Sequence, residues 1–144
     1  MIVRIDSDAD ILATRDVMRQ LRPHLGVDEY LPTIKRMMLT DGYRIAAVMD
    51  AGIVRAVAGY RLMEMLYCGR ILVIDDLVTD VDARSRGYGG ALIAWLSEEA
   101  ERRGCTQLHL DSRVHRERAH RFYIREGFSI TCFHFCADVR GAHA

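Results

Sequence analysis

Three glycines, Gly87, Gly89 and Gly90, follow a β-branched segment where the chain turns toward an amphipathic stretch. The first N–H groups of a helix have no partner inside the helix and carry partial positive charge. Glycine leaves these groups uncovered, because it has no Cβ to keep a ligand away from the main chain. Arg84 and Arg86 add guanidinium groups, which bind phosphate oxygens well. The stretch therefore predicts an anion site, and the chemistry that fits it is recognition of a diphosphate.

Two common nucleotide-binding motifs are absent from this stretch. A dinucleotide-binding turn needs a third spaced glycine and an acidic residue about 20 positions later, where this chain has His109. A P-loop needs a Gly-Lys-Ser/Thr sequence, which the chain lacks. A glycine turn can also serve to pack a helix closely against a strand, so the glycines alone leave both roles open.

The elements around the turn follow from the spacing of apolar residues, with period two in strands and three to four in helices. An Asp-Ala-Gly sequence at 50–52 predicts a hairpin. We expect strands at 1–5, 106–112 and 128–139, three antiparallel strands between 43 and 79, and helices at 11–22, 28–41, 88–103 and 116–126. This order predicts an α/β fold with a mixed, mostly antiparallel central sheet, helices on both faces, and a single domain over residues 1–144.

Charge, apolar runs and cysteine spacing argue against several classes of function. The chain has 144 residues with 20 basic and 20 acidic side chains, and this zero net charge argues against general binding to nucleic acid or to an anionic membrane. No early apolar run is long enough for export or for a membrane span, so we expect a cytoplasmic protein. The four cysteines form no paired motif, which fits a reducing compartment.

One segment contains residue types that bind soft metals. Cys132, His134 and Cys136 would share one face of the expected last strand, as in half of a soft-metal site. A fourth ligand is not evident, so we expect no metal.

Two motifs in this frame resemble those of a known family. The segment Arg84–Gly89 (R-S-R-G-Y-G) is similar to the [QR]-x-x-G-x-[GA] motif of the GNAT family of N-acetyltransferases. The segment Ala119–Phe128 is similar to their second signature, in which a helix delivers a tyrosine before a Gly-Phe pair. The order of strands and helices is similar over nearly the whole chain. The resemblance implies the acyl-CoA N-acyltransferase fold of this family, with acetyl-CoA as cosubstrate.

In that family, acetyl-CoA lies in a V-shaped opening between the strands that match 75–79 and 107–112. The resemblance implies that the main chain of Leu77, Val78 and Thr79 pairs with the pantetheine arm. It also implies that main-chain N–H groups of the turn hold the pyrophosphate, at Arg84, Ser85, Arg86, Gly87, Tyr88, Gly89 and Gly90. The chain departs from the family pattern at Thr79 and Val81, where members often have Val-x-Pro, and at Arg116, where many have asparagine.

The reaction that the resemblance implies needs no enzyme nucleophile, because holding amine and thioester in line lowers most of the barrier. The amine must lose a proton before it attacks, and the departing thiolate gains from a nearby acid. Tyr123 matches the family position that protonates the thiolate; its alternative role is core packing beside Phe122. Asp76 and Asp111 are the candidate bases. Asp75 is a weaker candidate. Asp75 and Asp76 are successive strand residues and face opposite sides, so one of them must lie on a covered or groove-facing side of the sheet. Each of the three carboxylates has a purely structural alternative.

We therefore expect an enzyme that moves an acetyl group from acetyl-CoA to a primary amine of a small molecule or a protein. The alternative is a sensor module that binds acetyl-CoA or CoA and does no chemistry. The carboxylates favour a cationic acceptor, although no motif identifies it. By analogy with the family, we also expect a homodimer that uses the apolar last strand.

Overall fold

The computed structural model describes residues 1–140. The chain divides into two compact units, Met1–Leu110 and a second unit that begins at Asp111, and each is described by itself. A single domain over residues 1–144 stays a prediction.

The strands of the first unit are β1 (Ile2–Ile5), β2 (Arg44–Asp50), β3 (Ile53–Met65), β4 (Gly69–Thr79) and β5 (Gln107–Leu110). Its helices are α1 (Asp8–Ala13), α2 (Arg15–Leu21), α3 (Val27–Asp41), the short 3-10 helix η1 (Val81–Ala83) and α4 (Tyr88–Arg102). The second unit contains α5 (Glu117–Arg125).

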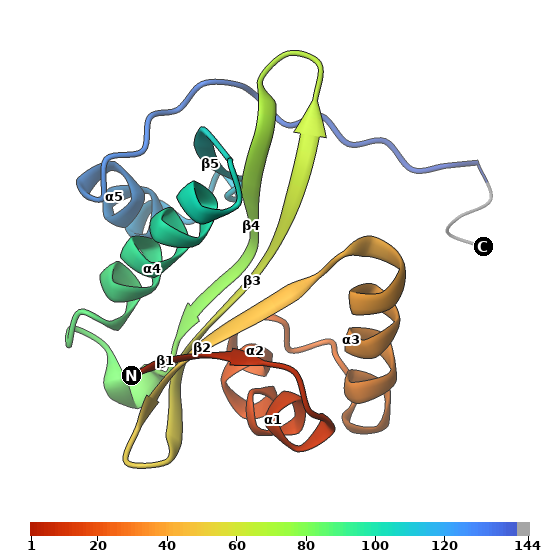
Figure 1. Ribbon diagram of the computed structural model, residues 1–144, viewed down its shortest axis with the longest axis vertical. Helices are drawn as coiled ribbons and strands as arrows, with labels where there is room; N and C mark the ends of the chain where they lie inside the picture. The colour runs from red at the N-terminus through yellow and green to blue at the C-terminus, as the bar shows by residue number, and fades with distance from the viewer. Residues whose placement is uncertain (141–144) are drawn as a thin grey trace. The chain divides into compact units, whose positions relative to one another are not determined.

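The strands form one sheet in which they lie side by side in chain order, β1-β2-β3-β4-β5 (Figure 1). The first four strands pair antiparallel, and β5 pairs parallel with β4. The parallel pair follows from the connection, because α4 carries the chain back to the edge at which β4 began. The predicted mixed, mostly antiparallel sheet is confirmed.

Helices cover both faces of this sheet, as predicted. On β2, Ile45 and Ala47 belong to a core that also contains Ile11, Met18 and Ile34 of α1, α2 and α3. The intervening Ala46 and Val48 are equally buried but lie outside that core. Since alternate strand residues point to opposite faces, they face the side on which α4 packs.

The predicted hairpin between β2 and β3 is also confirmed. Asp50 pairs with Ile53, which leaves Ala51 and Gly52 as a two-residue turn. Both turn residues have positive φ, 51° and 76°, as a type I′ turn requires.

The helix expected at 11–22 is instead two helices, α1 and α2, which meet at Thr14. The hydroxyl of this fully buried residue donates to the carbonyl oxygen of Ile11 at 2.6 Å and lies 2.8 Å from the hydroxyl of Tyr30. A side-chain bond to the backbone competes with helical hydrogen bonds and favours a break. Apolar spacing does not reveal the break, because apolar residues continue on both sides of it.

The last predicted strand, at 128–139, is wrong for the single chain. Within residues 111–140, the structure assigns no strand to this segment, and no residue of the segment enters the sheet. Its apolar side chains are exposed, among them Phe133 and Phe135 at 84% and 91%. A strand requires a neighbour for its backbone groups, and the apolar pattern alone does not supply one.

A buried carboxylate joins α4 to the sheet. Glu99 is fully buried. Both of its carboxylate oxygens accept hydrogen bonds from Arg4 of β1 at 2.8 Å. One oxygen also accepts a hydrogen bond from the hydroxyl of Tyr60 of β3 at 2.9 Å. Arg103 adds a further bond at 3.3 Å. Burial and the bond to Glu99 raise the pKa of Tyr60 to about 12, so its hydroxyl remains a donor. Burial disfavours the charge of Glu99, but the bonds from Tyr60, Arg103 and Arg4 hold its pKa below the ordinary value.

We predict that Glu99→Gln lowers the free energy of unfolding by about 1–3 kcal/mol at neutral pH, because buried donors lose a charged acceptor. The native pKa of Glu99 is depressed, so its contribution is complete above the ordinary value of 4.5 and is lost as the pH falls through the native pKa. The difference between wild type and variant should therefore shrink in acid, as measured by urea unfolding at several pH values.

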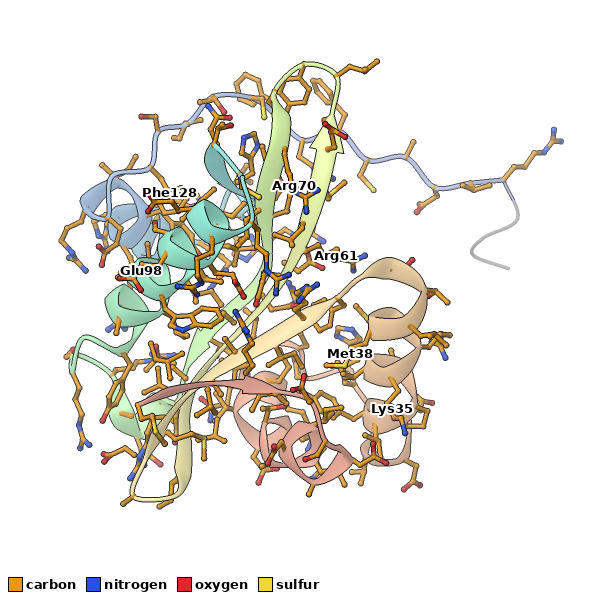
Figure 2. The ribbon with its side chains drawn as sticks, in the orientation of Figure 1. Lys35, Met38, Arg61, Arg70, Glu98 and Phe128 are labelled. Carbon is orange, nitrogen blue, oxygen red and sulfur yellow. The ribbon has the colours of Figure 1, made fainter. Side chains whose placement is uncertain are left out.

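The matched control is Glu98→Gln, on the exposed surface of the same helix (Figure 2), where the side chain is 71% exposed. Its effect should stay within about 0.5 kcal/mol. Equal effects of the two substitutions would contradict the role of Glu99.

Candidate functional site

The edge strand β5 separates from β4 about halfway along β4. Parallel pairing between them covers only Ile71–Ile74 of β4. Beyond this point β4 continues to Thr79, paired with β3 on its other side (Figure 1). Among residues 1–110, the outer edge of β4 therefore has no strand partner from Asp75 onward. Its main-chain groups can accept an extended molecule as an added strand.

The three residues expected to bind pantetheine lie on this edge. Leu77, Val78 and Thr79 pair with β3 on the inner side, and all three are half-buried. Their main-chain groups on the outer side are those that the parting of β4 and β5 leaves available. Side-chain identity matters little for such pairing, so Thr79 is compatible with it despite its departure from the family pattern.

A β-bulge lies where the strands part. Gly59 of β3 pairs with Asp76, and Tyr60 pairs with Ile74, so Asp75 has no partner on β3. A bulge interrupts strict alternation. The expectation that Asp75 and Asp76 face opposite sides of the sheet therefore does not apply here. The environment of each carboxylate is given by the contacts that it makes.

Asp76 is held by two donors. The hydroxyl of Tyr43 donates to Oδ2 at 2.6 Å, and Nε of Arg22 donates to Oδ1 at 2.9 Å. The side chain of Asp76 is 13% exposed. Burial, together with the negative charge of Asp76, raises the pKa of Tyr43 well above its ordinary value, so the phenol stays a donor. Both carboxylate oxygens of Asp76 therefore have a fixed partner.

Asp75 has a less complete set of partners. Nε of Arg61, which projects from β3 (Figure 2), donates to Oδ2 at 2.7 Å. The same guanidinium lies over the ring of Tyr43, 5.6 Å from its centroid, and Arg22 donates to the carbonyl oxygen of Asp75 at 3.0 Å. The two carboxylates thus belong to one cluster. Burial raises the pKa of Asp75 above its ordinary value, and the bond and charge of Arg61 offset only part of that effect.

Gly59 makes room for this cluster. A Cβ at this position would overlap the hydroxyl of Tyr43 and lie 2.7 Å from Oδ2 of Asp76. The bond between Tyr43 and Asp76 therefore crosses the space that a side chain at position 59 would occupy. Glycine is required here for close approach and not for an unusual φ.

The glycine turn follows β4 directly. Asp80 accepts a hydrogen bond from the side chain of Gln20 at 3.1 Å, and Gln20 accepts one from the N–H of Val81 at 2.9 Å, which ties the end of β4 to α2. The chain then passes η1 and reaches Ser85 and Gly87, whose φ values are 65° and 80°. Left-handed backbone is unfavourable for serine, so the turn holds some strain.

Gly87 is the N-cap of α4, and the first helical bond is donated by Ala91 to its carbonyl oxygen at 3.0 Å. The N–H groups of Tyr88, Gly89 and Gly90 thus precede the first intrahelical donor. A Cβ on Gly87 would meet no atom within 4 Å. Glycine is therefore favoured at this position by the positive φ and not by a lack of space. The exposed residues Arg84 and Arg86 precede these groups in the chain. These uncovered N–H groups are compatible with the predicted anion site, which stays a prediction.

The other two predicted catalytic residues belong to the second unit. Tyr123 lies on α5, with its ring against Phe122 and Phe128 at centroid distances of 5.5 and 5.9 Å. Asp111 comes directly after β5, and its Oδ2 lies 3.0 Å from Nδ1 of His134. Their roles stay predictions.

Sequence reasoning missed Arg22, Tyr43, Gly59 and Arg61. They come from the end of α2, the start of β2 and the middle of β3, and nothing in the local sequence joins them. The only available signal was Gly59, because a glycine inside a strand marks a bulge or a close approach.

Among residues 1–140, no three His, Cys, Asp or Glu side chains gather as a metal site would require. No helix in the same range is long and apolar enough to cross a membrane.

Comparison with known proteins identifies relatives over most of the chain. The acetyltransferase (GNAT) family matches residues 14–128. The chain is 32% identical over 124 residues to YhdJ, an uncharacterized N-acetyltransferase of Bacillus subtilis (strain 168), covering 85% of this chain and 87% of YhdJ. It is 31% identical over 93 residues to the aminoalkylphosphonate N-acetyltransferase of Salmonella typhimurium, covering 65% of this chain and 60% of that enzyme.

Solved structures share the fold at low identity. The aminoglycoside N-acetyltransferase AAC(6')-Iy in complex with CoA superposes with a TM-score of 0.83 at 16% identity, covering 97% of this chain and 95% of that one. The ribosomal-protein-alanine N-acetyltransferase of Brucella melitensis biovar Abortus 2308 superposes with a TM-score of 0.82 at 16% identity, covering 96% and 99%.

We predict that Gly59→Ala lowers the free energy of unfolding by about 1–3 kcal/mol, because the new Cβ overlaps Tyr43 and strains the cluster around Asp76. Denaturant unfolding measures the change. In a Tyr43→Leu background, which lacks the hydroxyl and the outer ring, the same substitution should have a smaller effect. Additive effects in this double-mutant cycle would contradict the assigned contact.

Proposed function

Because the chain belongs to the GNAT family of acetyltransferases, we propose that it transfers an acetyl group from acetyl-CoA to a primary amine of a small molecule. The observation that carries this proposal is the free edge of β4 leading into the uncovered N–H groups at the start of α4. An extended amide-containing arm fits the edge, and a pyrophosphate fits the helix start. The two features lie in the order in which these groups follow one another in CoA.

The residues proposed for the arm are Leu77, Val78 and Thr79, through main-chain hydrogen bonds. Those proposed for the pyrophosphate are the turn residues from Arg84 to Gly90. Arg84 and Arg86 supply full positive charge, while the N–H groups of the turn supply fixed donors. No metal enters this proposal, because the turn itself provides the donors for the phosphates.

In the proposed reaction, the amine nitrogen attacks the thioester carbonyl carbon, a C–N bond forms and the C–S bond breaks. The amine gives up one proton and the departing sulfur takes one, so the protein needs a base and an acid. Tyr123 is the proposed acid, since a phenol of ordinary pKa near 10 is protonated at neutral pH.

Asp76 and Asp111 remain candidates for the base, and the contacts on β4 support Asp75 as a third. One oxygen of Asp75 is bonded to Arg61, whereas both oxygens of Asp76 have partners. A raised pKa also makes Asp75 a better proton acceptor than an ordinary aspartate. We propose that Asp75 accepts the proton and that Asp76 orients Arg22 and Tyr43.

The acceptor class comes from charge and from relatives. The oxygen of Asp75 that Arg61 does not bond favours a protonated amine, although Arg61 and Arg22 offset the charge of the two carboxylates. One relative is named for aminoalkylphosphonates and one structural neighbour for aminoglycosides, so both classes begin the panel of acceptors. A peptide with a free N-terminal alanine represents the protein acceptors.

The test is release of CoA from acetyl-CoA in the presence of each amine, with binding measured by calorimetry. Amine-dependent release supports the enzyme. Binding of CoA without release from any amine in the panel would favour the sensor, and absence of binding would remove both hypotheses.

We predict that Gly87→Ala weakens CoA binding about tenfold or more, because an alanine at φ 80° is strained by about 1–2 kcal/mol and shifts the N–H groups of the turn. Gly104→Ala is the matched control. Gly104 follows the other end of α4, has a φ of 74° and also has no atom within 4 Å of an added Cβ. Calorimetric titration should give wild-type affinity for the control; equal weakening by both would contradict a phosphate role for Gly87.

We predict that Asp75→Asn and Tyr123→Phe each lower kcat by about 100-fold or more while leaving CoA affinity nearly unchanged. In wild type, kcat/KM should fall as the pH drops through the raised pKa of Asp75, and this acid limb should vanish in Asp75→Asn. Initial rates from pH 9 down to the lowest pH at which the protein stays folded measure both effects. If the acid limb persists in Asp75→Asn and vanishes in Asp76→Asn or Asp111→Asn, the base is the other carboxylate.

A further inference from the structure

We propose that the amine acceptor carries an acidic oxyanion, a carboxylate or a phosphonate, and that Arg61 and Arg22 bind this group beside Asp75. The inference rests on the proposed function, because it names the class of amine that the same site would take. It comes from a cluster of two arginines and two aspartates in the first unit, in which both arginines keep unused donors.

Arg61 is held in place by one side of its guanidinium. Its Nε donates to Oδ2 of Asp75 at 2.7 Å, and the guanidinium carbon lies 5.6 Å from the centroid of the Tyr43 ring. Among residues 1–140, the terminal nitrogens of Arg61 donate no hydrogen bond, and they are not among the buried atoms that lack a partner. These nitrogens therefore reach solvent while the rest of the side chain is fixed.

Arg22, the residue directly after α2, presents further donors to the same place. Its Nε donates to Oδ1 of Asp76 at 2.9 Å, and one terminal nitrogen donates to the carbonyl oxygen of Asp75 at 3.0 Å. Its other terminal nitrogen has no hydrogen-bond partner within the described part of the chain and is not buried. Because both arginines donate to Asp75, their unused donors lie within one small area.

A comparison within the chain shows what an arginine does when it only neutralises a carboxylate. Arg4 donates to Glu99 through both Nε and a terminal nitrogen, and both oxygens of Glu99 accept. Arg61 donates to Asp75 through Nε alone, so its terminal nitrogens stay available for another acceptor. Such a pair of guanidinium nitrogens matches the two oxygens of a carboxylate or a phosphonate.

The charges of the cluster select among classes of amine. The two arginines balance the two aspartates, so an acceptor with positive groups only meets no net attraction, and the arginines oppose its second cation. An amine that also carries an acid complements both signs. Its acid accepts from the unused donors of Arg61 and Arg22, and its amine faces the oxygen of Asp75 that Arg61 does not bond.

The donors are already held in position before an acceptor arrives. Asp76, which holds Arg22, is itself fixed by the hydroxyl of Tyr43 at 2.6 Å, and Gly59 leaves the space for that bond. A fixed donor loses little conformational freedom when a ligand binds. The arginines should therefore contribute more to recognition than mobile surface arginines would.

The experiment compares short amines that differ in the group opposite the nitrogen. β-Alanine and aminoethylphosphonate carry an acid, propylamine carries no charge there, and diaminopropane carries a second cation. In the assay of CoA release, kcat/KM should be about tenfold or more higher for the two acids, chiefly through a lower KM, because each adds charge-assisted hydrogen bonds. An equal or higher kcat/KM for propylamine or diaminopropane overturns the proposal.

Substitution of the arginines tests their assignment. Arg61→Gln and Arg22→Gln should each lower the ratio of kcat/KM for β-alanine to that for propylamine by about fivefold or more. The control is Arg70→Gln, an exposed arginine elsewhere on the sheet (Figure 2), which donates to the carbonyl oxygen of Arg103 at 2.9 Å and should leave the ratio unchanged. A loss of kcat that is equal for all amines means that the arginines act only on the carboxylates, and it overturns the proposal.

Binding measured without turnover separates this inference from the proposed function. Wild type, with and without CoA, is titrated with β-alanine and with ethylphosphonate, which has no amine, and both should bind more tightly than propylamine. If propylamine is acetylated but neither acid binds, the proposed function stands and the present proposal is overturned. If both acids bind and Arg61→Gln weakens them, the acid site stands even where no amine is acetylated. Absence of acid binding to wild type overturns the proposal, whether or not the variants fold.

Discussion

The structure depends on the hydrogen bonds that β4 makes along one side and leaves available on the other. Its inner side is paired with β3 from Gly69 to Thr79, while β5 covers its outer side for only four residues. Main-chain donors and acceptors require partners, so the uncovered part of the edge favours an extended polar ligand. The turn after β4 then supplies N–H groups of the same kind at Gly87–Gly90. In the proposed complex with CoA, main-chain groups would make most of the contacts, so the identities of the side chains at Leu77–Thr79 would matter little.

Two neighbouring residues of β3 link this edge to charged groups on both faces of the sheet. The hydroxyl of Tyr60 donates to the buried Glu99 of α4, whereas Gly59 leaves space for Tyr43 to reach Asp76 on the other face. The bulge at Asp75 lies opposite these two residues. Displacement of β3 at this point would therefore disturb the attachment of α4 and the carboxylate cluster together. Coupling of this kind holds the C-terminal part of α4, which contains Glu99, and the parting of the strands in one arrangement.

The sequence predicted the parts of the fold whose signals are local. Period two identified the strands from 43 to 79, and positive φ at Ala51, Gly52 and Gly87 matches the turns that were expected there. It did not predict the break at Thr14, which depends on contact with the distant Tyr30, or the bulge, which depends on register. The partners of Asp75 and Asp76 come from three separate elements, so no spacing rule connects them. The uncovered N–H groups at the start of α4 were therefore foreseeable, and the side chains that contact the carboxylates were not.

The segment Phe128–Val139 shows a different limit of sequence patterns. Its alternation predicted a strand, and the structure assigns none to these residues. A strand is stable only where its main-chain donors and acceptors meet those of a neighbour, and within residues 111–140 the structure gives this segment none. The alternation therefore describes side chains that could cover two faces of a sheet, whereas pairing depends on contacts that no pattern within the segment encodes.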